Sequence, residues 1–187
     1  MVPVREHRKM STFSGWKKFA KFLALMAATV LSGGCLGYPH NIEPVDNFEL
    51  NRYLGTWYEI ARLDHPFERR LQQVTAVYTL RQDGSIRVVN SGYDSQEKKW
   101  RQAEGRAFFV EDDERGYLKV SFFGPFFASY VIFHLDDYEH AWVTSSNMSY
   151  LWYLSRTPTV SPAKLHTFEN EVSRLGFNTE ELIYVKQ

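Results

Sequence analysis

The chain lacks most features that would place it among disulfide-stabilised, membrane-spanning or nucleic-acid-binding proteins. Its 187 residues include one cysteine, Cys35, so no disulfide can form within the chain. The apolar run at residues 22–31 is about half of the ~20 residues that a helix needs to span a bilayer. Six of the 22 basic and one of the 22 acidic residues lie in residues 1–35, which leaves 16 basic and 21 acidic residues beyond them. Nucleic-acid binding is disfavoured, because it requires clustered cations.

The N-terminal residues have the pattern of a leader peptide. Basic residues precede the apolar run at 22–31, and small residues 32–34 precede Cys35. This order resembles the processing site of bacterial lipoproteins, where the cysteine is acylated and becomes the first residue. Ser32 departs from the pattern, because such sites usually have leucine there. We interpret residues 1–34 as a lipoprotein signal peptide and Cys35 as the lipid anchor, with ordinary secretion and a free cysteine as the alternative.

The rest of the chain is predicted to form one all-β domain. Residues 35–50 are polar and turn-rich and are interpreted as a tether and lead-in where no core begins, followed by the domain at 51–187. Stretches rich in β-branched and aromatic residues then alternate with turn signals at about the 8–12-residue spacing of antiparallel sheets. The predicted strands are residues 55–63, 74–80, 86–93, 101–111, 117–123, 127–135, 140–145 and 150–157. Eight sequential strands favour an antiparallel up-and-down barrel, which has no exposed edge.

One helix is predicted after these strands. Ser161 is a suitable N-cap, Pro162 suits the first helical position, and Gly176 can adopt the left-handed conformation that ends a helix. The apolar side chains recur every three or four residues, at Leu165, Phe168, Val172 and Leu175. Such a stripe should pack on the outside of the barrel. Residues 182–185 are predicted to form a short ninth strand beside the first.

Three motifs resemble the signatures of the lipocalin family. Gly55-Thr56-Trp57 is similar to the Gly-x-Trp motif that opens the first lipocalin strand. Asp136-Asp137-Tyr138 resembles the turn between strands six and seven, and Arg156 the arginine after strand eight. The resemblance extends from about residue 47 to the end of the chain. It implies the eight-stranded barrel with one C-terminal helix that the strand pattern also favours.

The amino-acid sequences of three segments are closer to one branch of that family. Residues 53–62, 119–126 and 150–158 resemble the bacterial outer-membrane lipoprotein lipocalins, which are relatives of apolipoprotein D. The residue after the cysteine is Leu36 and not aspartate, which also resembles bacterial lipoproteins that are sorted to the outer membrane. The resemblance implies a lipid-anchored protein on the periplasmic face of the outer membrane.

A lipocalin barrel is open at one end for its ligand and must be closed at the other. At the closed end, Trp57 is expected to fill the floor, and Arg156 to cover the indole face through a cation–π interaction. Gly55 is expected to let the chain turn beneath the barrel. We therefore assign these three residues a structural role and do not count them as ligand contacts.

Aromatic side chains are the candidate ligand contacts, because the 16% aromatic content predicts a large interior or an apolar pocket. Trp152 shares the strand parity of Arg156 and should point inward. The resemblance places the positions of Trp152 and Phe127 at the pocket mouth. Tyr130 and Phe109 complete the candidate set, and the alternative is that all four are ordinary core residues.

Polar candidates are fewer. Arg62, Arg87 and Arg106 are candidates for a cation that meets a ligand head group, and the sequence leaves open which of them faces inward. The histidines do not supply three convergent zinc ligands, and no serine stands in a Gly-x-Ser-x-Gly motif. We therefore predict no catalytic residue, no metal and no cofactor.

The expected function is non-catalytic binding, storage or transport of a lysophospholipid or a long-chain fatty acid in the bacterial envelope. A lipid-modifying enzyme on the same barrel is one alternative, and a structural lipoprotein with a barrel filled by its own side chains is another. A homodimer is left open.

The anchor is tested by the Cys35→Ser variant. Because stable membrane attachment requires more than one acyl chain, the variant should lose its anchor and leave the membrane fraction after a salt wash. Cell fractionation and immunoblotting measure the distribution, with the wild type as the membrane-retained reference. A variant that stays in the washed membrane fraction would show that Cys35 is not the anchor.

Overall fold

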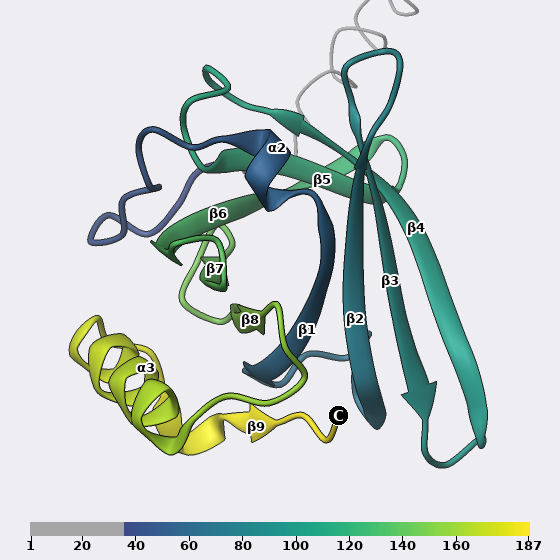
Figure 1. Ribbon diagram of the computed structural model, residues 1–187, viewed down its shortest axis with the longest axis vertical. Coiled ribbons are helices and arrows are strands. Elements are labelled where there is room, and N and C mark those ends of the chain that lie inside the picture. Colours follow the sequence, from purple (N-terminus) through teal and green to yellow (C-terminus); the bar gives the residue numbers. More distant parts are fainter. Residues whose placement is uncertain (1–35) are drawn as a thin grey trace, which may run out of the picture. The chain divides into compact units, whose positions relative to one another are not determined.

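Nine antiparallel strands form the sheet of residues 36–187, the part of the chain that the computed structural model describes. The predicted signal peptide and Cys35 lie outside the described residues. The strands are β1 (Gly55–Arg62), β2 (Leu71–Leu80), β3 (Ile86–Asp94), β4 (Lys99–Phe109), β5 (Tyr117–Phe123), β6 (Phe126–Asp136), β7 (His140–Thr144), β8 (Leu151–Ser155) and β9 (Ile183–Tyr184). Each strand from β2 to β7 pairs with the next in sequence, and β1 pairs with both β8 and β2 (Figure 1). The predicted eight-stranded barrel is therefore confirmed, and β9 adds to β1 outside the ring.

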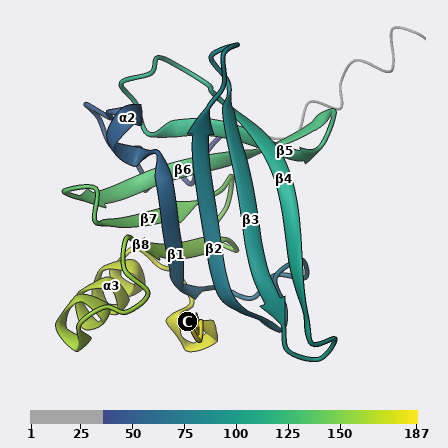
Figure 2. The same cartoon turned by 45° about the vertical axis from the view of Figure 1, so that its right-hand side comes forward.

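The barrel consists of two halves that cross at a steep angle. Strands β1 to β4 run side by side, and β5 to β8 run across them (Figure 2). Along every strand, alternate side chains face the interior. Across β2 to β4, one inward row contains only small or medium side chains, because Ala76 pairs with Asn90, which pairs with Ala103. This row leaves space inside the barrel.

The segment before β1 contributes to the core, so the prediction that no core begins there is wrong. Ile42 and Phe48 are 2% and 4% exposed. A four-residue helix, α2 (Leu50–Tyr53), then leads into β1 and was not predicted. Such a short helix has too few turns to give a periodic pattern in the sequence. Gly55 follows it with a φ of +99°, a conformation that favours glycine.

The three family motifs meet at one end of the barrel. Trp57 is fully buried, and the guanidinium carbon of Arg156 lies 4.0 Å from the centroid of its indole. The Arg156 guanidinium donates hydrogen bonds to the backbone carbonyls of Thr56 (2.9 Å), Arg52 (2.6 Å) and Tyr138 (3.1 Å). Arg156 therefore covers the indole and joins the chain before β1 to the turn between β6 and β7. These contacts close this end of the barrel.

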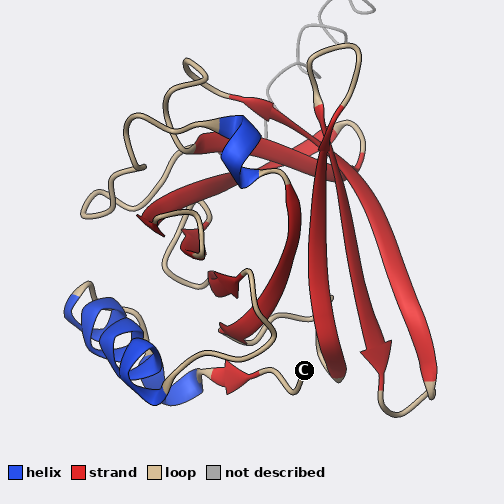
Figure 3. Cartoon of the chain, in the orientation of Figure 1, coloured by secondary structure: helices blue, strands red, loops and turns tan. Residues whose placement is uncertain are grey.

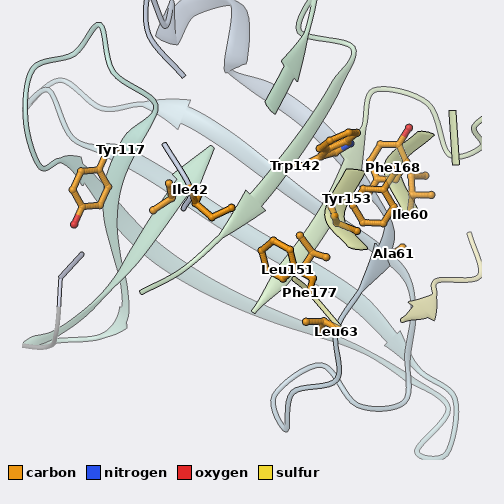
Figure 4. Close-up of a cluster of buried hydrophobic side chains, with 12 residues drawn as sticks. Ile42, Ile60, Ala61, Leu63, Tyr117, Trp142, Leu151, Tyr153, Phe168 and Phe177 are labelled. Atoms are coloured by element: carbon orange, nitrogen blue, oxygen red, sulfur yellow. The ribbon is translucent and has the colours of Figure 1, made fainter. Parts of the chain in front are cut away.

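The long helix α3 (Pro162–Arg174) packs outside the barrel (Figure 3). The Ser161 side chain accepts a hydrogen bond from the backbone N–H of Lys164, and Gly176 has a φ of +94°, as predicted. Phe168 is fully buried, and its ring centroid lies 4.8 Å from that of Tyr153 and 5.4 Å from that of Trp142 (Figure 4). No helix within residues 36–187 is long and apolar enough to cross a membrane.

The closed end gives a stability prediction. Trp57→Ala removes a fully buried indole and should lower the free energy of unfolding by about 3–5 kcal/mol. Arg156→Ala should cost less, because it removes a cover and leaves the indole in place. Urea unfolding measures both variants, and Trp100→Ala, at a site 61% exposed, is the control that should change stability by less than about 0.5 kcal/mol. Equal stability of Trp57→Ala and the wild type would contradict the role of the indole.

Candidate functional site

A cavity of about 910 Å³ occupies the barrel interior. This volume lies within the range of about 300–1,000 Å³ that is common for small-molecule sites. Four large side chains that border the cavity are also strongly exposed to solvent: Phe67 (63%), Trp100 (61%), Phe123 (81%) and Phe126 (65%). They lie in or beside the connections β1–β2, β3–β4 and β5–β6. The mouth of the cavity is therefore at the end of the barrel opposite Trp57, and it has an aromatic rim.

Three tyrosine hydroxyl groups form the inner end of the cavity. The Tyr130 hydroxyl lies 2.7 Å from the hydroxyl of Tyr53 and 2.7 Å from that of Tyr78, and all three side chains border the cavity. Burial raises the pKa of each of these hydroxyls, so they stay neutral and hydrogen-bonded. Behind them, the ring centroid of Trp57 lies 4.8 Å from that of Tyr53. The indole therefore supports the end of the cavity without bordering it.

The four predicted ligand contacts lie in different surroundings. Trp152 and Tyr130 border the cavity. Phe127 borders the cavity too. Its ring centroid lies 6.0 Å from that of Phe108 and 5.5 Å from the Lys119 amino group.

Phe109 is not among the residues that border the cavity. Its ring packs against that of Phe48 at 6.1 Å, and Phe48 borders the cavity in its place. The sequence interpretation missed this packing because it assigned Phe48 to the lead-in segment.

The three candidate arginines are engaged elsewhere. Arg87 is partly exposed and Arg106 is exposed, and they form ion pairs with Glu104 (2.7 Å) and Asp83 (3.7 Å), respectively. Arg62 is 2% exposed. One of its amino groups donates to Glu59 Oε1 at 2.7 Å, and the other donates to the backbone carbonyl of Glu68, also at 2.7 Å.

Two carboxyl groups border the cavity close to Arg62. Glu59 and Glu68 are 3% and 5% exposed. The indole N–H of Trp152 donates to Glu68 Oε2 at 3.1 Å, and His65 Nε2 lies 3.1 Å from the same oxygen. Sequence reasoning missed the two carboxyls. Alternation along β1 was the available signal for Glu59, because it stands two residues after the inward-facing Trp57.

Burial dominates the protonation of this group. Burial, reinforced by the charge of Glu68, raises the pKa of Glu59 well above its ordinary value, although Arg62 opposes the shift. Burial also raises the pKa of Glu68, against the stabilising hydrogen bond from Trp152. Burial and the neighbouring Arg62 lower the pKa of His65 to about 4. Burial therefore favours a proton on this pair of carboxyls, and His65 is uncharged near neutral pH.

Comparisons with known proteins agree with this geometry. A family described as "Lipocalin-like domain" matches residues 48–187. The chain is 54% identical over 165 residues to "Outer membrane lipoprotein Blc" of Vibrio cholerae, covering 87% of this chain and 96% of the relative. It is 48% identical over 150 residues to the protein of the same name in Escherichia coli K12, covering 80% and 85%. Among solved structures, insecticyanin of the tobacco hornworm Manduca sexta aligns with a TM-score of 0.65 at 19% identity, covering 82% and 88%.

His65 gives the site a pH-dependent signature. In the unfolded chain His65 has a pKa of ~6.5 and becomes protonated as the pH falls below that value. In the folded chain its pKa is about 4, so the imidazole becomes protonated only near pH 4. Stability is therefore lost through His65 as the pH falls through this window. The His65→Asn variant should lose about 2–3 kcal/mol less than the wild type between pH 7 and pH 4.

Urea unfolding at a series of pH values measures this difference, since contributions from the other groups cancel between the two proteins. His166→Asn, on the exposed face of α3, is the matched control and should follow the wild type. If His65→Asn and the wild type lost stability equally, His65 would not be held uncharged in the fold.

Proposed function

Because the chain belongs to the lipocalin family, we propose that it binds a lysophospholipid or a long-chain fatty acid inside its barrel, without catalysing a reaction. The cavity of about 910 Å³ is the observation that carries this proposal. Each methylene that leaves water contributes about 0.8 kcal/mol, so a long acyl chain gains several kcal/mol even after the cost of ordering it. A barrel filled by its own side chains would leave no such volume, and this argues against the structural alternative.

The residues that follow Cys35 support exchange of the ligand with a membrane. Leu36 directly follows Cys35, and the backbone N–H of Gly37 donates to Ser129 Oγ at 3.0 Å. Ser129 belongs to β6 and borders the cavity. The described chain therefore begins beside the cavity wall, on the strand whose hairpin carries the exposed ring of Phe126. A lipid that leaves the bilayer near the acylated Cys35 would meet the aromatic rim directly.

The cellular setting follows from the same residues and from the relatives. Residues 1–34 direct export, acylated Cys35 holds the protein on the periplasmic face of the outer membrane, and residues 35–50 connect the anchor to the barrel. Relatives that share about half of the residues are named outer membrane lipoproteins. The protein stores or carries lipid within the bacterial envelope.

Trp152 provides an optical test of ligand binding. It borders the cavity, so an acyl chain that enters should displace water from its indole and change its fluorescence. Titration of the wild type with a lysophospholipid and with a long-chain fatty acid should give a saturable emission change. The change should be largely lost in Trp152→Phe, while the affinity falls by no more than ~1–2 kcal/mol because an aromatic ring remains.

Trp142→Phe is the matched control. Trp142 is 5% exposed, packs against Phe168 of α3 and does not border the cavity, so its loss should leave the signal intact. A signal of full size in Trp152→Phe would place the ligand away from Trp152, since Trp100 of the rim also borders the cavity. The absence of a saturable signal in every protein, with either lipid, would contradict lipid binding.

A further inference from the structure

One wall of the cavity carries two carboxyl groups beside a single buried guanidinium. Glu59 and Glu68 both border the cavity, but Arg62 pairs only with the Glu59 carboxyl and bonds Glu68 through its backbone carbonyl. With both carboxyls ionised, this group of three side chains has a net charge of −1. A buried excess charge is costly unless a further cation balances it. The wall is therefore suited to a ligand that brings one positive charge.

Aromatic rings border the cavity beside these carboxyls. The Trp152 indole is hydrogen-bonded to Glu68, and its ring centroid lies 5.8 Å from that of Tyr150 in a stacked arrangement. Phe67 is adjacent to Glu68 in the chain and also borders the cavity. Aromatic faces attract ammonium groups, and carboxylates accept charge-assisted hydrogen bonds from them. Both recognition elements of an ammonium site are present on one wall.

The buried polar atoms behind this wall are incompletely satisfied. His65 is 2% exposed, and neither of its ring nitrogens has a hydrogen-bond partner, although Nε2 lies 3.1 Å from Glu68 Oε2. Arg62 Nε is also buried without a partner. Buried polar atoms are nearly always hydrogen-bonded in folded proteins. Unsatisfied polar atoms at a cavity wall therefore indicate a position where a polar ligand group can bind.

We propose that Glu59, Glu68 and the Trp152 ring form a subsite for the primary ammonium group of a long-chain amine or an amine-bearing lipid. This subsite rests on the proposed function, because it lies in the same cavity. The ammonium group donates hydrogen bonds to the two carboxyls while its hydrocarbon chain occupies the apolar part of the barrel. An alcohol of the same length gains no ion pair with the two carboxyls.

Binding at this subsite releases one proton. Burial raises the pKa of both Glu59 and Glu68, which favours one proton held by the pair when no ligand is bound. When an ammonium group binds, the pair gives this proton to solvent, and two carboxylates then balance Arg62 and the ligand. The other groups facing the pair do not compensate: His65 is uncharged at neutral pH, and the Tyr78 hydroxyl is neutral.

The experiment compares dodecylamine, dodecanol and dodecanoate, each below its critical micelle concentration, as competitors of a fluorescent fatty-acid probe at pH 7. In the wild type, dodecylamine should compete at least tenfold more strongly than dodecanol. The preference should fall to less than threefold in Glu59→Gln. Calorimetry in two buffers of different ionisation enthalpy should detect about one proton released per dodecylamine in the wild type, and none with dodecanol. Glu104→Gln, outside the barrel and paired with Arg81 and Arg87, is the matched control and should keep the preference.

The outcomes separate the subsite from lipid binding. If dodecanol and dodecanoate compete as strongly as dodecylamine in the wild type, the ammonium subsite is wrong while lipid binding stands. If none of the three compounds displaces the probe, both proposals fail. Circular dichroism shows whether Glu59→Gln folds. If it does not, the wild-type comparison and its proton release decide alone, and a tenfold preference without proton release would contradict the role of Glu59.

Discussion

Closure of the sheet through β1 is the constraint on which the rest of the structure depends. Because β1 pairs with both β8 and β2, every strand of the ring has two neighbours and the side chains divide into an inner and an outer set. Trp57 and Arg156 occupy the inner space at one end. The small or medium side chains of Ala76, Asn90 and Ala103 leave the interior open toward the other end of the barrel. The cavity results from this division of side chains. On the outside of the ring, α3 packs against aromatic side chains.

The polar groups inside the barrel matter because they are buried. Hydroxyl and carboxyl groups in such a place are stable only when they are hydrogen-bonded or paired. The tyrosine hydroxyls at the inner end satisfy one another through Tyr130. The carboxyls of Glu59 and Glu68 instead depend on one arginine and one retained proton. The inner end is therefore a neutral stop for a hydrocarbon chain, whereas the wall beside Trp152 is the place where a head group can be discriminated.

Much of the fold could be predicted because its signals are local. Strand alternation, the Ser161 cap and the Gly176 terminus each depend on neighbours in sequence. The site depended on contacts between distant segments and was predicted less well. Phe48 displaces Phe109 from the cavity, which could not be inferred from a segment without periodicity. Phe127 and Tyr130 both border the cavity although they are three residues apart, a spacing that strand alternation alone would place on opposite faces. Glu68 reaches Trp152 only because the connection between β1 and β2 folds over the wall, and no pattern in the sequence marks that path.

The central claim is that the barrel encloses a lipid, and mass spectrometry of the lipids extracted from the purified, natively folded protein tests it most directly. The account predicts acyl lipids recovered at close to one molecule per barrel, depleted when the protein is first stripped with organic solvent and restored after incubation with membrane lipid. Protein that carries no lipid after purification, and takes up none from added membrane lipid, would contradict it.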